Sequence, residues 1–216
     1  MFVELDSKFL SKIATDSERV PTLYYSKNWF VKKFFWLRLK LIYKMLKKRK
    51  ADDRCLDFCG GGGVFLPTLS SCFKSVTFAD LEDTEAKKVV NFFKLNNVDL
   101  VKGDIANTKF KPNSFDVIIA ADVLEHFKDL SVPVNILKKC LSKKGVLYTS
   151  LPTESYLYVL LRKLFKIVKP KDHYHNGSVI EKYLQTLGFI KVKRRYVPFC
   201  YIPFFSLFTI GEWKLK

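Results

Sequence analysis

The sequence has 216 residues, a length that suits one well-buried domain with extra elements. Hydrophobic residues make up 48% and charged residues 27%, the proportions of a globular protein. No stretch long enough to span a bilayer is free of charged side chains, which argues against a membrane-spanning helix. The formal net charge of +17 favours an anionic partner such as a membrane surface, a nucleic acid or an acidic metabolite, although solvated lysine faces alone would give the same value.

The N-terminus and the cysteines bear on the compartment. Residues Met1 to Asp6 have neither the basic start nor the small-residue cleavage site of a secretory signal, so we expect a cytoplasmic protein. The five cysteines are an odd number and include no C-x-x-C pair, so we expect reduced thiols rather than disulfides or a zinc site.

The first predicted element is a long helix over residues 23–50, which is basic and rich in aromatic side chains. At 100° per residue, its apolar side chains cover one broad side and its lysines gather on the other. The apolar side comprises Phe30, Val31, Phe34, Phe35, Leu37, Leu41, Ile42, Met45 and Leu46, and the basic side Lys32, Lys33, Lys40, Lys44 and Lys47. We expect residues 1–50 to form a helical extension that covers the substrate or contacts a membrane, and residues 51–216 to form the main domain.

Short apolar runs alternate with amphipathic stretches between Asp53 and Pro152, which is typical of β-α-β units in a parallel sheet covered on both faces. The predicted fold class is therefore α/β. The predicted strands here are Arg54 to Phe58, Ser75 to Ala79, Asp99 to Val101, Phe115 to Ala120 and Gly145 to Ser150. The predicted helices are Val64 to Phe73, Thr84 to Leu95 and Val132 to Leu141, the last followed by a stop at Lys143, Lys144 and Gly145.

The region after Pro152 begins with an apolar and basic segment. The predicted elements are Tyr156 to Val168, a helix from Ser178 to Leu187, a strand from Phe189 to Pro198 and a last strand near Ser206 to Leu215.

A glycine loop follows the first strand of the α/β region. The segment LDFCGGGG, residues 56–63, opens the next helix, where glycine lets the backbone turn sharply and approach a ligand closely. Asp80 ends the second strand, 19 residues after Gly61, near the spacing at which a carboxylate reaches ribose hydroxyls. Together they indicate a nucleotide-type site.

The chain resembles the class I S-adenosylmethionine (SAM)-dependent methyltransferases, in particular the type 11 branch that includes enzymes of ubiquinone and menaquinone biosynthesis. The resemblance covers residues 53–190 and rests on LDFCGGGG, Asp80 in FADLED, Gly103-Asp104-Ile105, SFDVIIAADVLEHF at 114–127 and KKGVLYTSLP at 143–152. It implies a Rossmann-like fold with a mostly parallel seven-stranded sheet and helices on both faces, to which this chain adds its N-terminal basic amphipathic helix.

The resemblance also implies which residues hold SAM, whose product is S-adenosylhomocysteine (SAH). Asp57 and the backbone of residues 59–63, with Cys59, Gly61 and Gly63, would hold the methionine part. Asp80 would bind the ribose hydroxyls with Leu81 beside the adenine, Asp104 and Ile105 would meet the adenine edge, and Ala121 and Asp122 would line the pocket after the fourth strand. Cys59 replaces the usual first glycine of the loop, and we expect it to be accommodated if its φ is negative.

Methyl transfer is an in-line displacement, so the protein mainly aligns the acceptor and excludes water. For a hydroxyl or an acidic carbon a general base helps, and the candidates are His126, His173 and His175. The alternative for His126 is packing against the adenine side of the pocket, and for the other two a loop contact or solvent exposure. The histidines lack cysteine or carboxylate partners at ligand spacing along the sequence, so no metal is expected.

The acceptor is less well defined by the sequence. The segment Ala121 to Leu124 lacks the Asn/Asp-Pro-Pro-aromatic motif of adenine amino-group methylation, which weakens a nucleic-acid acceptor. The segments 29–46, 156–168 and 198–205 are apolar and flanked by lysines, so they favour an anionic membrane surface and a lipid, quinone-like or lipid-linked acceptor, unless they pack on one another and the core. An RNA methyltransferase, a non-catalytic SAM-binding subunit and a soluble small-molecule acceptor remain alternatives, and the oligomeric state is open.

Overall fold

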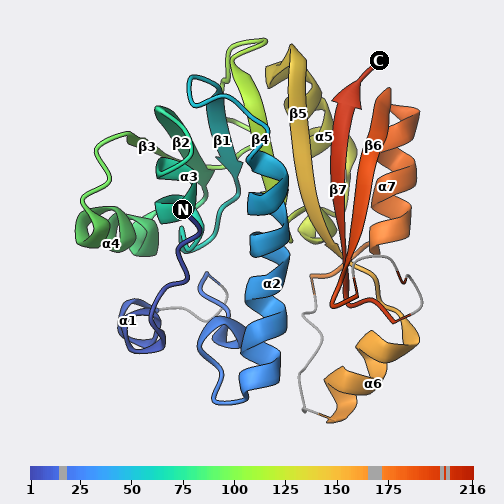
Figure 1. Ribbon diagram of the computed structural model, residues 1–216. Coiled ribbons are helices and arrows are strands. Elements are labelled where there is room, and N and C mark those ends of the chain that lie inside the picture. Colours follow the sequence, from blue (N-terminus) through green and yellow to red (C-terminus); the bar gives the residue numbers. More distant parts are fainter. Residues whose placement is uncertain (15–18, 165–171, 200–201, 203–204) are drawn as a thin grey trace.

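In the computed structural model, seven strands form one sheet in the order β3-β2-β1-β4-β5-β7-β6 (Figure 1). The structure describes residues 1–14, 19–164, 172–199, 202 and 205–216. β7 pairs antiparallel with both β5 and β6, and all other pairs are parallel. The strands are β1 (Arg54–Phe58), β2 (Ser75–Asp80), β3 (Val98–Lys102), β4 (Phe115–Ala121), β5 (Leu141–Pro152), β6 (Phe189–Val197) and β7 (Phe208–Leu215). The predicted mostly parallel seven-stranded sheet is confirmed.

Helices cover both faces of the sheet because successive side chains point to opposite faces and the central strands are apolar on both. Cys55 of β1 and Val117 of β4 face one core, whereas Leu56 and Ile118 face the other. The first core is covered by α1 (Ser7–Ile13), α2 (Trp29–Leu46), α3 (Leu66–Ser70) and α4 (Thr84–Phe93), and the second by α5 (Ser131–Cys140) and α7 (Gly177–Thr186). The remaining helical elements are η1 (Thr22–Tyr25), η2 (Leu124–His126) and α6 (Tyr156–Leu164).

The N-terminal helix is shorter than predicted and is packed on the sheet along most of its length. The side chain of Asn28 accepts hydrogen bonds from the backbone N–H groups of Phe30 and Val31, so α2 begins at Trp29 and the preceding residues form the separate turn η1. Phe30 was predicted to lie on the buried apolar face of the helix, but it is exposed. The buried residues of α2 are Trp36, Arg38, Leu39, Leu41, Ile42, Met45 and Leu46.

Other boundaries differ at the ends of elements. The predicted helix 64–73 is reduced to α3, and α5 passes into β5 at Leu141 without the break predicted at Lys143 to Gly145. α6 ends at Leu164 among the described residues, and the rest of the predicted segment up to Val168 lies outside them. At Leu141 the pairing of β5 with β4 and β7 along the sheet outweighs the local helix-stop signal at Lys143 to Gly145.

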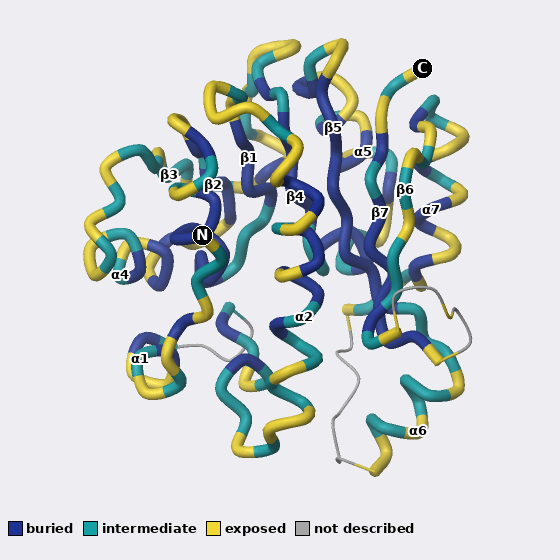
Figure 2. Tube along the Cα trace, viewed as in Figure 1, coloured by how far each residue is buried: buried dark blue, intermediate teal, exposed yellow. Residues whose placement is uncertain are grey.

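The carboxyl ends of the parallel strands meet at one edge of the sheet, the lower edge in Figure 1. α2 runs antiparallel to these strands, because Arg38 pairs with Asp122 after the end of β4 while Arg49 donates to the carbonyl of Asp116 near its start. α6 follows β5 at the same edge and has no buried residue, in contrast to the buried central strands (Figure 2). None of the helices in the described part of the chain is long and apolar enough to cross a membrane.

Candidate functional site

The glycine loop lies between the end of β1 and α3 and has no room for larger side chains. Gly61 and Gly63 have φ values of +57° and +71°, which glycine adopts without strain. A Cβ on Gly63 would lie 3.0 Å from the Cα of Ala86, so this glycine also lets the loop approach α4. A Cβ on Gly60 would lie 2.6 Å from the Oδ2 atom of Asp57. Gly60 and Gly63 therefore allow the loop to pack closely against Asp57 and α4.

Cys59 adopts a backbone conformation that its residue type disfavours. Its φ is +52°, so the negative φ under which a cysteine was expected to be accommodated here is not observed. Its backbone N–H donates to the carbonyl oxygen of Ala79 at 2.7 Å, which anchors the loop to β2 in this conformation. A non-glycine residue there costs on the order of 1–3 kcal/mol, a strain that concentrates at ligand sites.

Asp57 is a buried carboxyl group at the base of the loop. Its Oδ2 atom is buried and has no hydrogen-bond partner among the described residues. Burial, followed by the negative charge of Asp80, raises the pKa of Asp57 to about 7. A cationic group placed over the loop would supply the missing partner.

Asp80 joins the loop to the N-terminal segment. Its Oδ2 atom accepts a hydrogen bond from the backbone N–H of Gly61 at 2.9 Å, and its Oδ1 atom pairs with the guanidinium of Arg19. The carbonyl oxygen of Arg19 in turn accepts from the backbone N–H of Gly62 at 2.7 Å. Arg19 therefore covers the loop and contacts the carboxylate predicted to bind ribose, and no signal in the sequence pointed to it.

The other residues predicted for the adenine side follow β2 and β3. Leu81 is 55% exposed after Asp80, while Ile105 is buried in the core. Asp104 accepts a hydrogen bond from the backbone N–H of Ala106 at 2.9 Å, which fixes the turn after β3. The backbone N–H of Gly103 donates to the carbonyl of Asp80 at 2.9 Å, so this turn lies beside the predicted ribose ligand.

Asp122 lies just after β4, next to the half-buried Ala121, and is held by buried partners. Its φ is +52°; its Oδ1 atom accepts from the Ser150 hydroxyl at 2.7 Å, and its carboxylate pairs with the guanidinium of Arg38. Arg38 also donates to the Tyr24 hydroxyl at 2.7 Å, and burial lowers the pKa of its guanidinium. The helical periodicity placed no charged residue on this face of α2, so Arg38 was missed.

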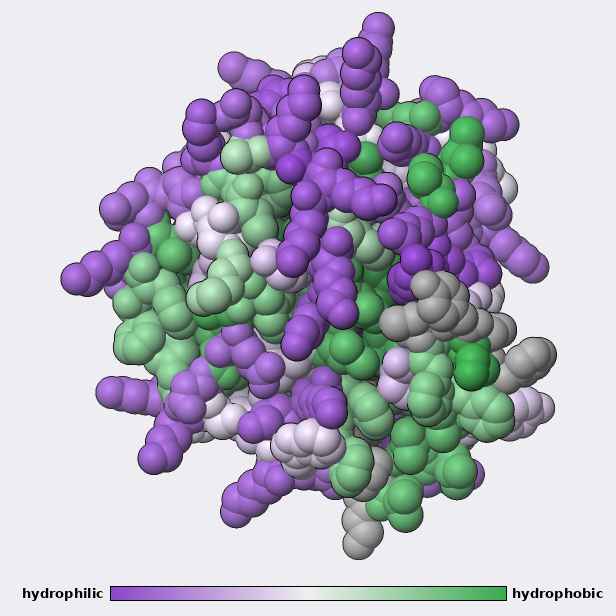
Figure 3. Space-filling view, viewed as in Figure 1, coloured by the Kyte–Doolittle hydropathy of each residue, from purple (hydrophilic) through white to green (hydrophobic). Residues whose placement is uncertain are grey.

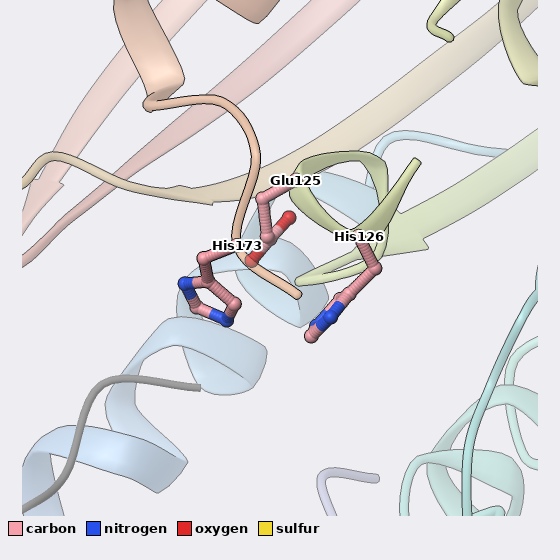
Figure 4. A group of neighbouring side chains, drawn as sticks. All are labelled: Glu125, His126 and His173. Carbon is pink, nitrogen blue, oxygen red and sulfur yellow. The ribbon is translucent and has the colours of Figure 1, made fainter. Parts of the chain in front are cut away.

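A cluster of titratable side chains lies immediately beyond Asp122. Glu125, His126 and His173 each offer one ligand atom, and these atoms all lie within 4.8 Å of one another (Figure 4). The Nδ1 atom of His126 lies 2.6 Å from the Oδ2 atom of Asp172, and its ring meets that of His173 edge-on with centroids 4.7 Å apart. Burial raises the pKa of Glu125 to about 8. Two of the three predicted base candidates therefore come together, joined by two carboxylates that the sequence analysis did not connect with them.

His175 lies apart from this arrangement. Its Nε2 atom is 3.1 Å from the carbonyl oxygen of Lys128, a contact between its loop and the loop after η2. This geometry corresponds to the loop contact that the sequence analysis gave as its alternative role.

A family model described as a methyltransferase domain matches residues 35–193. The match spans well over half of the sequence. The chain belongs to the methyltransferase domain family. The resemblance to class I SAM-dependent methyltransferases is thereby confirmed, and the protein is a SAM-dependent methyltransferase. No curated protein matches the sequence.

Several solved structures share the fold of this methyltransferase at low sequence identity. Magnesium protoporphyrin IX methyltransferase (ChlM) from Synechocystis PCC 6803 with bound SAH is 17% identical, with a TM-score of 0.71 over 98% of this chain and 100% of that one. The PH0226 protein from Pyrococcus horikoshii OT3 is 20% identical, with a TM-score of 0.70 over 93% and 99%. The N-methyltransferase NodS from Bradyrhizobium japonicum WM9 in complex with SAH is 15% identical, with a TM-score of 0.68 over 97% of each chain.

The loop of this methyltransferase fits SAM, which supplies a methyl group on a positively charged sulfur. The unpartnered carboxyl group of Asp57 suits the cationic methionine end of the cofactor. The glycines let the loop backbone pack against Asp57, Arg19 and Ala86, where a Cβ would clash. The carboxylate of Asp80 suits the ribose hydroxyls once Arg19 gives up its contact. The individual residue assignments remain predictions.

Proposed function

We propose that this methyltransferase acts at an anionic membrane surface, on the cytoplasmic face, and methylates a lipid, quinone-like or lipid-linked acceptor. The observation that carries this proposal is a group of exposed apolar side chains at the edge of the sheet where the acceptor enters. In this fold type, ligands bind outside the carboxyl ends of the parallel strands. ChlM is named for magnesium protoporphyrin IX, and NodS is named as an N-methyltransferase. Because these two neighbours differ from each other, the fold leaves the acceptor open.

We call these exposed side chains the apolar rim. They come from the start of α2, from α6 and from the connection between β6 and β7, all at the carboxyl edge, and each is more than half exposed. The members are Trp29, Phe30, Tyr156, Leu160, Leu164, Phe199 and Phe205. Figure 3 shows apolar side chains gathered at the lower right of the molecule, over α6. Apolar side chains concentrated at one edge mark an interaction surface.

Basic residues accompany the rim. The ammonium group of Lys33 lies 4.2 Å from the centre of the Trp29 ring, and the last turn of α6 contains Arg162 and Lys163. Each lysine or arginine close to an anionic bilayer contributes about 1 kcal/mol to binding. Aromatic and aliphatic side chains next to basic ones match the boundary between lipid headgroups and acyl chains.

α6 is anchored at the same edge of the sheet as the polar side chains beyond β4. Tyr158 of α6 meets Phe208 edge-on with ring centroids 6.2 Å apart, and Phe208 pairs with Pro152 at the end of β5. Burial raises the pKa of the Tyr158 phenol. α6 therefore follows the carboxyl end of β5, as Glu125 and His126 follow that of the neighbouring strand β4. An acceptor held by the rim would reach these side chains and the cofactor loop from the same edge.

The experiment that tests this function follows a labelled methyl group. Purified protein is given radiolabelled SAM and an extract of the source cells, and the products are separated into lipid, RNA, protein and small-molecule fractions. We expect label in the lipid fraction, lost in Asp80→Ala, and reduced several-fold in the double variant Leu160→Ser/Leu164→Ser with unchanged affinity for SAM.

The matched control removes two exposed apolar side chains far from the rim. Ile190 and Val192 lie in the first half of β6, away from the carboxyl edge, and are exposed to a similar extent. The variant Ile190→Ser/Val192→Ser should transfer methyl groups to lipid as the natural protein does. Label in RNA would contradict the proposal and support an RNA methyltransferase, whereas SAM binding without label in any fraction would support a non-catalytic subunit.

A further inference from the structure

We propose that Glu125, His126 and His173 bind a divalent metal ion, which in turn binds an oxygen atom of the acceptor. This inference rests on the proposed function only for the identity of the acceptor. The three ligand atoms lie within 4.8 Å of one another, and the side chains point toward a shared space (Figure 4). A metal ion about 2.1 Å from each donor requires donors no more than about 4.2 Å apart, so small side-chain rotations complete the site.

The carboxyl group of Glu125 supplies an independent sign of a missing ligand. Glu125 is 1% exposed, and its Oε2 atom makes no hydrogen bond with any residue that the structure describes. A buried polar atom without a partner is costly, and native structures rarely leave one. The guanidinium of Arg38 is a nearby cation, but Arg38 is already paired with Asp122 and bonded to Tyr24. A metal ion between Glu125 and the two histidines would satisfy this oxygen.

Hydrogen bonds hold the two contributing segments together. The backbone N–H of Tyr174 donates to the carbonyl of Glu125 at 2.9 Å, and His175 contacts the carbonyl of Lys128 at 3.1 Å. His173 is therefore fixed opposite η2, although it comes from the connection to α7. Holding the two segments together lowers the cost of ordering the donors when an ion binds.

Asp172 orients one of the proposed ligands. Its Oδ2 atom lies 2.6 Å from Nδ1 of His126, an arrangement in which Nδ1 donates the hydrogen and Nε2 keeps its lone pair for a metal. Histidine ligands of metals commonly donate their second nitrogen to a carboxylate in this way. The pair thus provides both a ligand and the group that fixes its tautomer.

The donor set and its position indicate the class of metal and its role. Two imidazole nitrogens and one carboxylate oxygen suit Zn²⁺, Mn²⁺ or Co²⁺ better than Mg²⁺ or Ca²⁺, which prefer oxygen ligands. Three protein ligands leave coordination positions open for water or substrate. Because Glu125 follows Asp122 by three residues, an acceptor hydroxyl bound there would lie next to the cofactor pocket with its pKa lowered by the ion.

The test measures metal binding directly, on full-length protein without a polyhistidine tag, after removal of metals with a chelator. Titration with Co²⁺, followed by its visible absorption, and with Zn²⁺, followed by calorimetry, should show one ion bound per chain. Glu125→Gln and His173→Gln should each weaken binding at least tenfold. His175→Gln, two residues along the same segment, should bind as the natural protein does.

The outcomes separate this inference from the proposed function. SAM affinity is measured for every variant without metal, and an unchanged value shows that the variant is folded. Absence of stoichiometric binding by the natural protein, or equal binding by Glu125→Gln, would overturn the metal site while leaving lipid methylation untouched. One bound ion with label in a fraction other than lipid would support the metal site and overturn the proposed acceptor.

Discussion

Asp57 and Cys59 show how the site is built one residue at a time. Asp57 is buried beneath the loop with one oxygen unpartnered, and Cys59 is held with a φ of +52° beside it. Both features carry a cost in the protein without ligand, and both occur in the loop predicted to hold SAM. A bound cation that contacts Asp57 would offset the cost of its burial.

The titration of Asp57 predicts how SAM binding depends on pH. With a pKa of about 7, raised by burial and by Asp80, this carboxyl group is protonated below neutral pH and does not attract a cation. SAM affinity should therefore rise as pH increases through about 7, and binding below that pH should release a proton. In Asp57→Asn this pH dependence should disappear and affinity at pH 8 should fall about tenfold or more.

The pH dependence of protein stability provides the control for this prediction, because stability should fall as pH rises whereas SAM affinity should increase. A carboxyl group whose pKa is raised by folding stabilises the protein below its unfolded pKa, and this contribution is lost as pH rises through about 7. Calorimetric SAM titrations and thermal unfolding at several pH values measure both effects. A natural protein whose SAM affinity is flat between pH 6 and 8 would contradict the assignment of Asp57 to the cationic part of SAM.

At the scale of elements, α2 is part of the site as well as its cover. Arg38, in the middle of this helix, pairs with Asp122 after β4 and bonds to Tyr24 of η1, while Trp36 donates its indole N–H to the Tyr24 carbonyl at 3.1 Å. The ring of Phe35 also lies 3.7 Å from the Arg38 guanidinium carbon. These contacts fix α2 against the carboxyl edge of the sheet, the edge where the proposed acceptor would enter.

A double-mutant cycle tests this link between α2 and β4. Arg38→Met removes the ion-pair partner of the partly buried Asp122 carboxylate and leaves it only the Ser150 hydroxyl, so the free energy of unfolding should fall by about 3 kcal/mol. Asp122→Asn should also be destabilising, but the double variant should lose less than the sum of the two, because neither charge is then left unpaired. Urea unfolding monitored by tryptophan fluorescence gives the values, and additive losses would show that the two side chains do not depend on each other.

For the whole molecule, the charge of +17 and the apolar rim predict two separable contributions to membrane binding. The electrostatic part is screened by salt, whereas the apolar part is not. Co-sedimentation with vesicles rich in phosphatidylserine should be strong at low salt and weaken markedly toward about 500 mM NaCl, where the Debye length is only a few ångströms. Leu160→Ser/Leu164→Ser should reduce the binding that survives high salt, and Ile190→Ser/Val192→Ser should not.

Neutral vesicles and RNA complete that experiment. Vesicles of phosphatidylcholine alone should bind more weakly at low salt, because they lack the anionic surface. Equal binding of both lipids would contradict the electrostatic contribution, and displacement of the protein from anionic vesicles by small amounts of RNA would favour a nucleic-acid partner.

The sequence by itself determined the α/β class, a parallel sheet and the position of the glycine loop. These features follow from local signals: short apolar runs, amphipathic helices between them, and the LDFCGGGG turn with Asp80 at a fixed distance. The seven-stranded, mostly parallel sheet was what the family resemblance implied. The predicted β1 matched residue for residue, and Asp57 and Asp80 lie where the motif placed them.

The tertiary structure alone decided the contacts between residues far apart in the chain. Arg19 with Asp80, Arg38 with Asp122, and His173 with Glu125 are each pairs from different segments, and no spacing along the sequence encodes them. The helical pattern of α2 predicted burial of apolar residues only. Periodicity along one helix cannot show that a buried arginine has a carboxylate partner on another element, as Arg38 has in Asp122. Packing of residues 19–46 and of residues 172–175 against the carboxyl edge of the sheet created these pairs.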